Sequence, residues 1–177
     1  MIDLSDIKLL ICDVDGVLSD GRIIYSASGD EMKCFHCRDG AGLKYWQRAG
    51  GTVAWITGRK SALVERRAEE LGVVVLRSGV TRKRRVFHEV ITELGFKPHE
   101  TGVIGDDLID LPMMYDAGFS ACPSDAVLDV RNHVNYVASV PGGAGAVREI
   151  VEYLLQNSGR WSRVMARYLP NAIEDTP

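Results

Sequence analysis

Near the start of the chain lies the stretch Lys8-Leu9-Leu10-Ile11-Cys12-Asp13-Val14-Asp15-Gly16-Val17-Leu18, in which an apolar run ends in a pair of acids. An apolar run closed by a glycine is typical of a buried parallel strand whose carboxyl end opens into a loop. Ligands of open α/β sheets bind at this edge. Two carboxylates so close repel each other unless a cation intervenes or one holds a proton. The pair Asp13 and Asp15 therefore indicates chemistry more than packing.

The composition is that of an ordinary globular chain. It has 177 residues, 46% of them hydrophobic, and a formal net charge of −3, which fits one domain with a sizeable core. This charge gives no electrostatic basis for binding nucleic acid or an anionic membrane. No apolar run reaches the roughly 20 residues that span a bilayer, and the acidic start is unlike a signal peptide. We expect a cytoplasmic protein with no nucleic-acid or membrane partner.

The four cysteines, Cys12, Cys34, Cys37 and Cys122, show no disulfide framework. Cys34 and Cys37 have a spacing that could provide half of a zinc site. On a strand, however, their side chains would point to opposite faces, and no second pair of ligands follows. We expect all four to be reduced structural thiols.

Apolar runs alternate with amphipathic segments along the chain. The expected strands are residues 8–14, 52–57, 73–76, 101–105, 119–122 and 134–138. The expected helices are residues 40–49, 60–71, 81–95, 108–117, 125–131 and 144–156. In 60–71, for example, the apolar positions 63, 64, 68 and 71 form one stripe, and Gly72 ends the helix. This βαβα order predicts an α/β fold with a mostly parallel sheet that is covered on both faces.

One segment breaks the alternation. Residues 22–26 and 31–37 flank Ala27-Ser28-Gly29-Asp30 and predict a β-hairpin over about 20–37. Because the hairpin lies between the first strand and the first helix, we expect it to project beyond the ligand-binding edge. We assign residues 1–157 to one domain and residues 158–177 to a C-terminal tail.

Polar residues with complementary chemistry follow the expected strands. A carboxylate such as Asp13 can attack a phosphoryl group to form an aspartyl-phosphate, and Asp15 can protonate the leaving alkoxide and then deprotonate water. The hydroxyl of Thr57 and the ammonium of Lys83 can hold phosphoryl oxygens where charge develops. Asp106 adds negative charge that a hard cation, most simply Mg²⁺, would cancel.

Each of these residues also has an ordinary structural interpretation. Asp107 or Asp110 can cap a helix, Thr57 can cap the helix 60–71, and Lys83 can be one more solvated charge in a basic run. Their occurrence together at successive strand ends, in complementary roles, favours a common site over these separate explanations.

Four motifs in order carry a resemblance to a known family: Asp13-x-Asp-Gly-Val-Leu18, Ile56-Thr-Gly-Arg59, an isolated Lys83, and Gly105-Asp-Asp-x-x-Asp110. They resemble the haloacid-dehalogenase superfamily of phosphatases. Together with Asp39-Gly-x-Gly42 and Gly142-Gly-Ala-Gly-Ala-Val-Arg-Glu149, they are similar to its capless branch that acts on eight-carbon ulosonic acid phosphates in lipopolysaccharide synthesis. The resemblance covers residues 6–157.

The resemblance implies a Rossmann-like fold, Mg²⁺ and a homotetramer. It implies that Asp13 is the nucleophile and Asp15 the acid/base, and that Mg²⁺ binds Asp13, the Asp15 carbonyl and Asp106, with support from Asp107. By the same resemblance, Thr57 and Lys83 bind phosphate. Gly58 is a further expected substrate-binding residue, and Arg38, Arg59, Arg148 and Arg160 are the candidates to meet the carboxylate of a small acidic sugar phosphate.

The intervals between the motifs leave no room for a separate cap domain. The hairpin and one helix use most of the chain between Asp13 and Thr57, and the interval from Lys83 to Asp106 is shorter still. Since phosphoryl transfer profits from excluding water, we expect a neighbouring copy to provide the lid. The hairpin is the expected assembly element, and the tail with Arg160 and Trp161 is the expected cover of the adjoining site.

Three alternatives remain open. The first is a phosphatase of a nine-carbon acid such as 2-keto-3-deoxynononate 9-phosphate; there the residue after Thr-Gly tends to be acidic, whereas here it is Arg59. The second is a phosphoacceptor module of the response-regulator kind, in which Lys comes last, whereas Lys83 precedes Asp106 here. The third is a catalytically silent assembly domain, which the intact set of catalytic positions disfavours.

Overall fold

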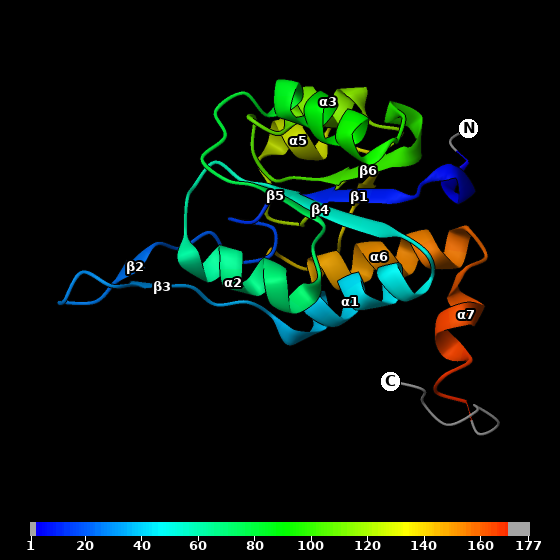
Figure 1. The fold of residues 1–177 in the computed structure, drawn as a ribbon, viewed down its shortest axis with the longest axis horizontal. Coiled ribbons are helices and arrows are strands. Elements are labelled where there is room, and N and C mark those ends of the chain that lie inside the picture. Colours follow the sequence, from blue (N-terminus) through cyan, green and yellow to red (C-terminus); the bar gives the residue numbers. More distant parts are fainter. Residues whose placement is uncertain (1–2, 170–177) are drawn as a thin grey trace.

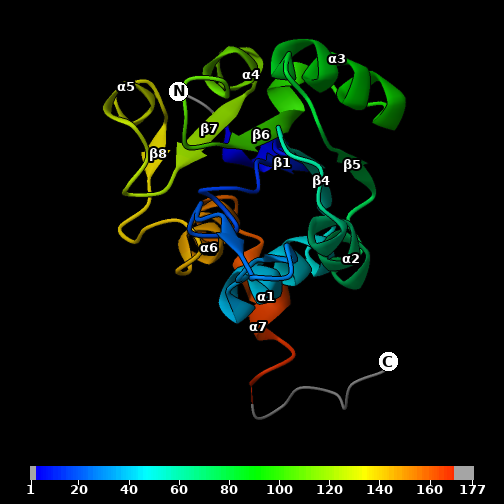
Figure 2. The same cartoon turned by 90° about the vertical axis from the view of Figure 1, so that its left-hand side faces the viewer.

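A six-stranded parallel sheet forms the centre of the computed structural model, which describes residues 3–169. Its strand order is β5-β4-β1-β6-β7-β8, and Figure 2 looks onto its carboxyl edge. The strands are β1 (Leu9–Cys12), β4 (Thr52–Ile56), β5 (Val75–Arg77), β6 (Thr101–Ile104), β7 (Phe119–Cys122) and β8 (Tyr136–Val137). The predicted α/β class is confirmed. All six predicted strands exist, and each differs from its expected range by no more than a few terminal residues.

Helices cover both faces of the sheet, as expected (Figure 1). One face carries α1 (Cys37–Arg48), α2 (Ala62–Leu71) and α6 (Ala146–Asn157); the other carries α3 (Lys83–Leu94), α4 (Leu111–Asp116) and α5 (Leu128–Arg131). Two short 3₁₀ turns, Leu4–Asp6 and Pro98–Glu100, precede β1 and β6. No helix within residues 3–169 has the length and apolarity to cross a bilayer.

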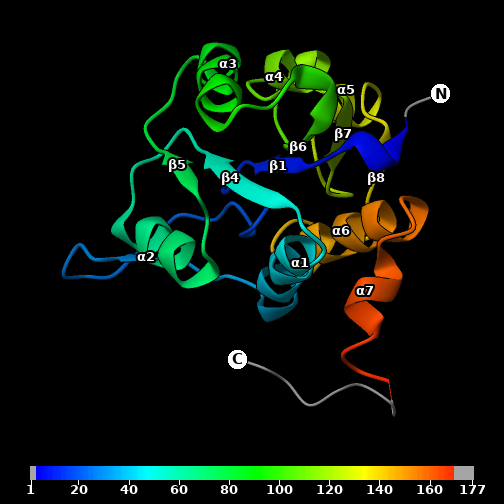
Figure 3. The same cartoon turned by 45° about the vertical axis from the view of Figure 1, so that its right-hand side comes forward.

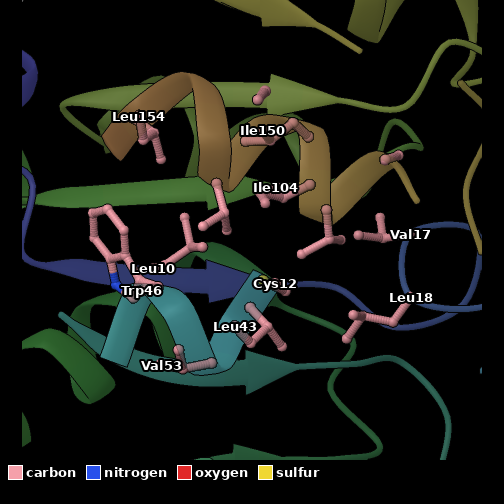
Figure 4. Packing of buried hydrophobic residues seen from close by; sticks show 14 of the residues in the cluster. Leu10, Cys12, Val17, Leu18, Leu43, Trp46, Val53, Ile104, Ile150 and Leu154 are labelled. Atoms are coloured by element: carbon pink, nitrogen blue, oxygen red, sulfur yellow. The ribbon is translucent and has the colours of Figure 1, made fainter. Parts of the chain in front are cut away.

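The apolar strands divide their side chains between two cores. In β1, Leu10 and Cys12 pack with α1 and α6, whereas Leu9 and Ile11 pack with α3 and α4. Figure 4 shows Leu10 and Cys12 beside Leu43, Trp46 and Ile150. Because successive side chains of a strand point to opposite faces, a strand between two helical layers needs an unbroken apolar run. The run Leu9–Cys12 meets this requirement.

The predicted hairpin is present and projects beyond the sheet (Figure 1). Its paired parts, β2 (Ile24–Tyr25) and β3 (Glu31–Met32), are shorter than the expected strands. Cys37 begins α1 instead of ending a strand, so the expectation that Cys34 and Cys37 lie on opposite strand faces was wrong. Both remain free and exposed, while Cys12 and Cys122 are free and buried.

The start of the predicted tail belongs to the folded body. Trp161–Met165 forms α7, Val164 is only 1% exposed, and the Trp161 ring lies 6.2 Å from that of Tyr45. Arg160 stacks over the Trp46 ring and donates to the Leu4 carbonyl. Figures 1 and 3 place α7 at the end of the molecule away from the hairpin. Arg160 and Trp161 therefore pack on their own chain, and the rest of the tail, 170–177, lies outside the described residues.

Asp39 connects α1 to the beginning of α6. Its carboxylate accepts hydrogen bonds from the backbone N–H groups of Gly145 and Arg148, which lie at the N-terminal end of α6. Burial raises the pKa of Asp39, while these two N–H donors counteract the shift. The first N–H groups of a helix have no hydrogen-bond acceptor within the helix. The carboxylate of Asp39 therefore supplies acceptors for the start of α6.

We expect Asp39→Ala to lower the free energy of unfolding by about 1–2 kcal/mol, because buried N–H groups of α6 lose their acceptor. Urea denaturation checks this, with Glu69→Ala on the exposed side of α2 as the matched control. Equal stability of the two variants would contradict the capping role.

Candidate active site

Asp13, Lys83 and Asp106 lie together at the point where the order of strands in the sheet reverses. The chain passes from β1 outward to β4 and β5, then returns to place β6 on the other side of β1. The loops that carry Asp13 and Asp106 leave the carboxyl ends of these two neighbouring strands, and the Asp13 N–H donates to the Ile104 carbonyl at 2.9 Å. Crevices at such a reversal are where open α/β sheets bind ligands.

Glycines let three segments meet at this edge of the sheet. Gly16 has a φ of +91°, and a Cβ there would lie 2.1 Å from a carboxylate oxygen of Asp106. A Cβ on Gly142 would lie 1.8 Å from the Gly16 carbonyl oxygen. The neighbouring Gly143 N–H donates to the Val17 carbonyl at 3.0 Å. The glycine-rich segment before α6 therefore closes directly against the loop that follows Asp13.

Lys83 provides the positive charge at the centre of the site. Its ammonium lies 2.8 Å from Asp13 Oδ1 and 2.6 Å from Asp110 Oδ1. Only 2% of Lys83 is exposed, and Asp110 is fully buried. The interpretation of Lys83 as a solvated surface charge is therefore wrong, because the side chain at the start of α3 points into the site.

The pKa values of the acidic groups and of Lys83 are shifted by burial and by their charged neighbours. Burial, followed by repulsion from Asp110, raises the pKa of Asp13 to about 6, although Lys83 opposes the shift. Burial and the charges of Asp13 and Asp110 raise the pKa of Asp106 to about 8. Burial acts to lower the pKa of Lys83, but the two neighbouring carboxylates raise it overall. The single positive charge of Lys83 does not neutralise the three acidic side chains of Asp13, Asp106 and Asp110.

The unsatisfied oxygens fit a divalent cation. Asp13, Asp106 and Asp110 each have a carboxylate oxygen within 4.8 Å of the others, and Asp13 Oδ1 and Asp106 Oδ1 are buried without a hydrogen-bond partner. Asp13 Oδ1 does have the Lys83 ammonium nearby. Hard cations such as Mg²⁺ bind carboxylate oxygens. The donor set is thus suited to the predicted metal.

Asp110, which we considered as a simple helix cap, organises the site instead. One of its oxygens accepts from Lys83, and the other accepts from the N–H groups of Asp106 and Asp107. With its oxygens used in this way, Asp110 shapes the loop after β6, while Oδ1 of Asp106 is left buried without a hydrogen-bond partner. The exposed Asp107 accepts from the Leu108 N–H and lies outside the acidic cluster.

Thr57 lies buried at the end of β4, with 1% of its surface exposed. Its Oγ1 accepts from the Arg59 N–H at 3.4 Å, and Ser61, not Thr57, occupies the N-cap position of α2. Gly58 is exposed. The Arg59 guanidinium donates to Glu31 of the hairpin at 3.0 Å, so this candidate for the substrate carboxylate already has an acidic partner.

Two of the other predicted arginines, Arg38 and Arg148, line a separate cavity. Arg38 and Arg148 border a space of about 370 Å³ beside the N-terminal ends of α1 and α6. Arg148 pairs with Glu152 and lies over the Tyr45 ring at 4.4 Å from its centroid. This cavity is not lined by Asp13, Lys83 or Asp106.

Asp15 has a partner that sequence reasoning missed. The Lys33 ammonium, which follows β3, donates to Asp15 Oδ1, and only 2% of the Lys33 side chain is exposed. The Asp-x-Asp motif gives no signal for this partner, because the contact depends on how the hairpin folds back. Its position in Glu31-Met-Lys33, at the base of the hairpin, was the only available hint.

A Rossmann-like sheet with an Asp-x-Asp loop, a buried lysine and a second acidic loop defines a hydrolase of the haloacid dehalogenase-like class. The haloacid dehalogenase-like hydrolase family model matches residues 38–118. The chain is 42% identical to the 3-deoxy-D-manno-octulosonate 8-phosphate phosphatase of Yersinia pestis over 151 residues, which are 85% of this chain and 81% of that protein. The chain belongs to the family of 3-deoxy-D-manno-octulosonate 8-phosphate phosphatases.

Solved structures of this family have the same fold. The crystal structure of the Yersinia pestis phosphatase matches with a TM-score of 0.88 and 40% identity, covering 90% of this chain and 86% of that one. The Moraxella catarrhalis phosphatase, crystallised with magnesium, phosphate and KDO, matches with a TM-score of 0.91 and 38% identity, covering 94% and 96%.

We expect Asp106→Asn to stabilise the metal-free protein at neutral pH and to abolish stabilisation by Mg²⁺. The folded pKa of Asp106, about 8, lies above its ordinary value of 3.8, so the metal-free protein loses stability as pH rises through this interval. At neutral pH Asp106 must take up a proton on folding, whereas Asn does not, so the substitution should raise Tm by about 2–4 °C. Thermal unfolding with and without Mg²⁺ measures both effects. A variant that Mg²⁺ stabilises as well as the original would argue against Asp106 as a ligand.

Proposed function

We propose that this protein is a Mg²⁺-dependent phosphomonoesterase that hydrolyses 3-deoxy-D-manno-octulosonate 8-phosphate to 3-deoxy-D-manno-octulosonate (Kdo) and phosphate. The observation that carries the proposal is the meeting of Asp13, Asp106 and the buried Lys83 at the carboxyl edge of the sheet. A nucleophile, a cation-binding carboxylate and a fixed ammonium are the groups that phosphoryl transfer requires.

The substrate assignment is supported by the close relatives, which are phosphatases of this eight-carbon sugar acid. Arg59 supports it less than its sequence position suggested, because Glu31 already neutralises its guanidinium. Arg38 and Arg148 remain proposed contacts for the acidic end of the substrate. A nine-carbon ulosonic acid phosphate is the alternative within the same reaction class.

In the first half of the reaction, a carboxylate oxygen of Asp13 attacks phosphorus and the bond from phosphorus to the sugar oxygen breaks. Asp15 gives its proton to the departing oxygen, so Kdo leaves as an alcohol and Asp15 becomes a carboxylate. The Thr57 hydroxyl and the Lys83 ammonium hold the equatorial phosphoryl oxygens. Lys83 needs no rearrangement for this task, because Asp13 and Asp110 already fix it.

In the second half, Asp15 takes a proton from a water molecule that attacks phosphorus. The acyl phosphate bond breaks, phosphate leaves, and the Asp13 carboxylate is restored. Asp15 is again protonated and ready to act as an acid. The proton therefore passes from the attacking water to the leaving sugar oxygen of the next substrate through this single residue.

The carboxylates of Asp13 and Asp106 and the Asp15 backbone carbonyl would hold Mg²⁺. When bound, the cation offsets the negative charge shared by the acids and the phosphoryl group. Asp110 and the proposed support residue Asp107 would act from outside this ligand set.

We also propose that copies of the chain assemble, as a homotetramer, through the hairpin. Four large apolar side chains of this ribbon are exposed, namely Ile23, Ile24, Tyr25 and Met32. An isolated two-stranded ribbon is marginally stable in water, and such side chains are typical of a protein interface. A neighbouring copy is then the proposed source of the lid that the capless chain lacks.

We expect kcat/KM to be highest for 3-deoxy-D-manno-octulosonate 8-phosphate in a panel that includes nine-carbon ulosonic acid phosphates and hexose phosphates. Release of phosphate with and without Mg²⁺ measures this. Asp13→Asn should lower turnover by more than about 1,000-fold while leaving Tm close to the original. A preference for the nine-carbon acid would move the substrate assignment, and full activity of Asp13→Asn would exclude the aspartyl-phosphate route.

We expect removal of residues 170–177 to reduce kcat/KM for the sugar phosphate by about tenfold, equivalent to 1.4 kcal/mol of lost binding, without changing Tm. Removal of residues 159–177 should lower Tm as well as kcat/KM, because Val164 and Trp161 pack on the body of the chain. Steady-state kinetics and thermal unfolding of both truncations separate the two effects. An unchanged kcat/KM in the shorter deletion rejects the tail as part of a lid.

A further inference from the structure

The base of the hairpin is bound to two catalytic loops at once. Glu31 in β3 accepts from the Arg59 guanidinium at 3.0 Å and from the Ser61 hydroxyl at 2.8 Å. Two residues further along, Lys33 donates to Asp15. The hairpin is therefore connected to the Thr57-Gly58-Arg59 segment and also to the loop that carries the proposed acid/base.

The pair Lys33 and Asp15 is buried in a way that restricts its geometry. The Lys33 side chain is 2% exposed and that of Asp15 is 18% exposed. A buried ammonium that lost its carboxylate would be strongly destabilised, because no water would replace the partner. The Asp15 side chain is consequently confined to orientations in which Oδ1 meets Lys33.

The two oxygens of Asp15 have different surroundings. Oδ1 accepts from Lys33, whereas Oδ2 is buried and has no hydrogen-bond partner among the described residues. A buried oxygen without a partner is unusual in a folded protein and calls for an explanation. The explanation offered by the reaction is that Oδ2 carries the proton that passes to and from the substrate.

We infer that Lys33 is a positioning residue that holds Asp15 by one oxygen so that the other meets the leaving group. This inference rests on the proposed function, because it assumes that Asp15 is the acid/base. The ion pair that Lys33 makes with the described residues is with Asp15. It makes the hairpin, a projecting element remote from the sheet, part of the proton-transfer machinery.

The inference has a chemical consequence that a merely structural ion pair lacks. An aliphatic alkoxide leaves slowly without a proton, whereas an acidic phenolate leaves without help. Losing the orientation of Asp15 should therefore harm alkyl phosphates far more than activated aryl phosphates. Loss of general packing would harm both kinds of substrate to the same extent.

The test uses Lys33→Met, which keeps the length of the side chain and removes its charge. We expect kcat/KM for 3-deoxy-D-manno-octulosonate 8-phosphate and for a simple alkyl phosphate to fall by about 100-fold, the lower range for a lost general acid. For p-nitrophenyl phosphate we expect less than about a threefold change. Because kcat/KM reports the steps up to the first irreversible one, here departure of the leaving group, a series of substituted phenyl phosphates should give a loss that grows with leaving-group basicity.

Three further variants isolate the role of Lys33. Arg22→Met removes another hairpin cation, which pairs with Asp20 and not with Asp15, and should leave the ratio of alkyl to aryl rates unchanged. Glu31→Gln loosens the other connection of the hairpin and should not produce the leaving-group dependence. In an Asp15→Asn background, Lys33→Met should add no further leaving-group dependence, since the residue that it positions is already disabled.

The possible results separate the inference from the proposed function. An equal loss on alkyl and aryl substrates, or a loss confined to the sugar acid, would overturn the positioning role in favour of packing or substrate contact. If Lys33→Met did not fold, Lys33→Arg would replace it, both in the unmodified protein and in the Asp15→Asn variant. Because Lys33→Arg keeps the positive charge, it should show the leaving-group dependence of the unmodified protein. A steeper dependence in Lys33→Arg than in the unmodified protein would contradict the inference. If the unmodified protein hydrolysed no phosphate ester with Mg²⁺, the proposed function would fail and the inference with it.

Discussion

The ion pairs of the buried Lys83 ammonium are the interactions on which the candidate active site depends. The ammonium lies within 2.8 Å of Asp13 and 2.6 Å of Asp110, so it connects the start of α3 to the loops after β1 and β6. A charge with so little exposure is tolerated only where partners replace water. The packing of α3 on the sheet therefore determines the shape of the site, because a shift of the helix would move the Lys83 ammonium and leave two buried carboxylates without it.

Sequence reasoning was most successful where the backbone alone determines position. Asp13, Thr57 and Asp106 follow parallel strands, and parallel strands bring their carboxyl ends to one edge whatever the side chains do. It was less successful where position depends on how a side chain is used. Asp110 has the sequence position of a helix cap, yet its oxygens bind Lys83 and the loop amides. Lys33 and Glu31 could not be assigned, because their contacts arise from the direction in which the hairpin returns. Arg59 was predicted from residue type, and its pairing with Glu31 depends on the same return.

The hairpin thus combines two properties. Its outer part exposes Ile23, Ile24, Tyr25 and Met32, whereas its base is joined by polar contacts to Asp15 and to the Arg59 segment. In a family with a separate cap domain, closure over the substrate is the task of a mobile part of the same chain. Here the structure has a ribbon whose base is bound to the loop of Asp15 and to the Arg59 segment, which favours closure by assembly over closure by hinge motion.

The close approach of Gly142 to Gly16 has a consequence for synthesis of the protein. The loop after Asp13, near the beginning of the chain, is supported by backbone contacts from the glycine-rich segment just before α6. A nascent polypeptide that still holds this segment inside the ribosome has its acidic pair without that support. The loop with the acidic pair would therefore acquire its folded shape only after the glycine-rich segment has left the ribosome and packed against it.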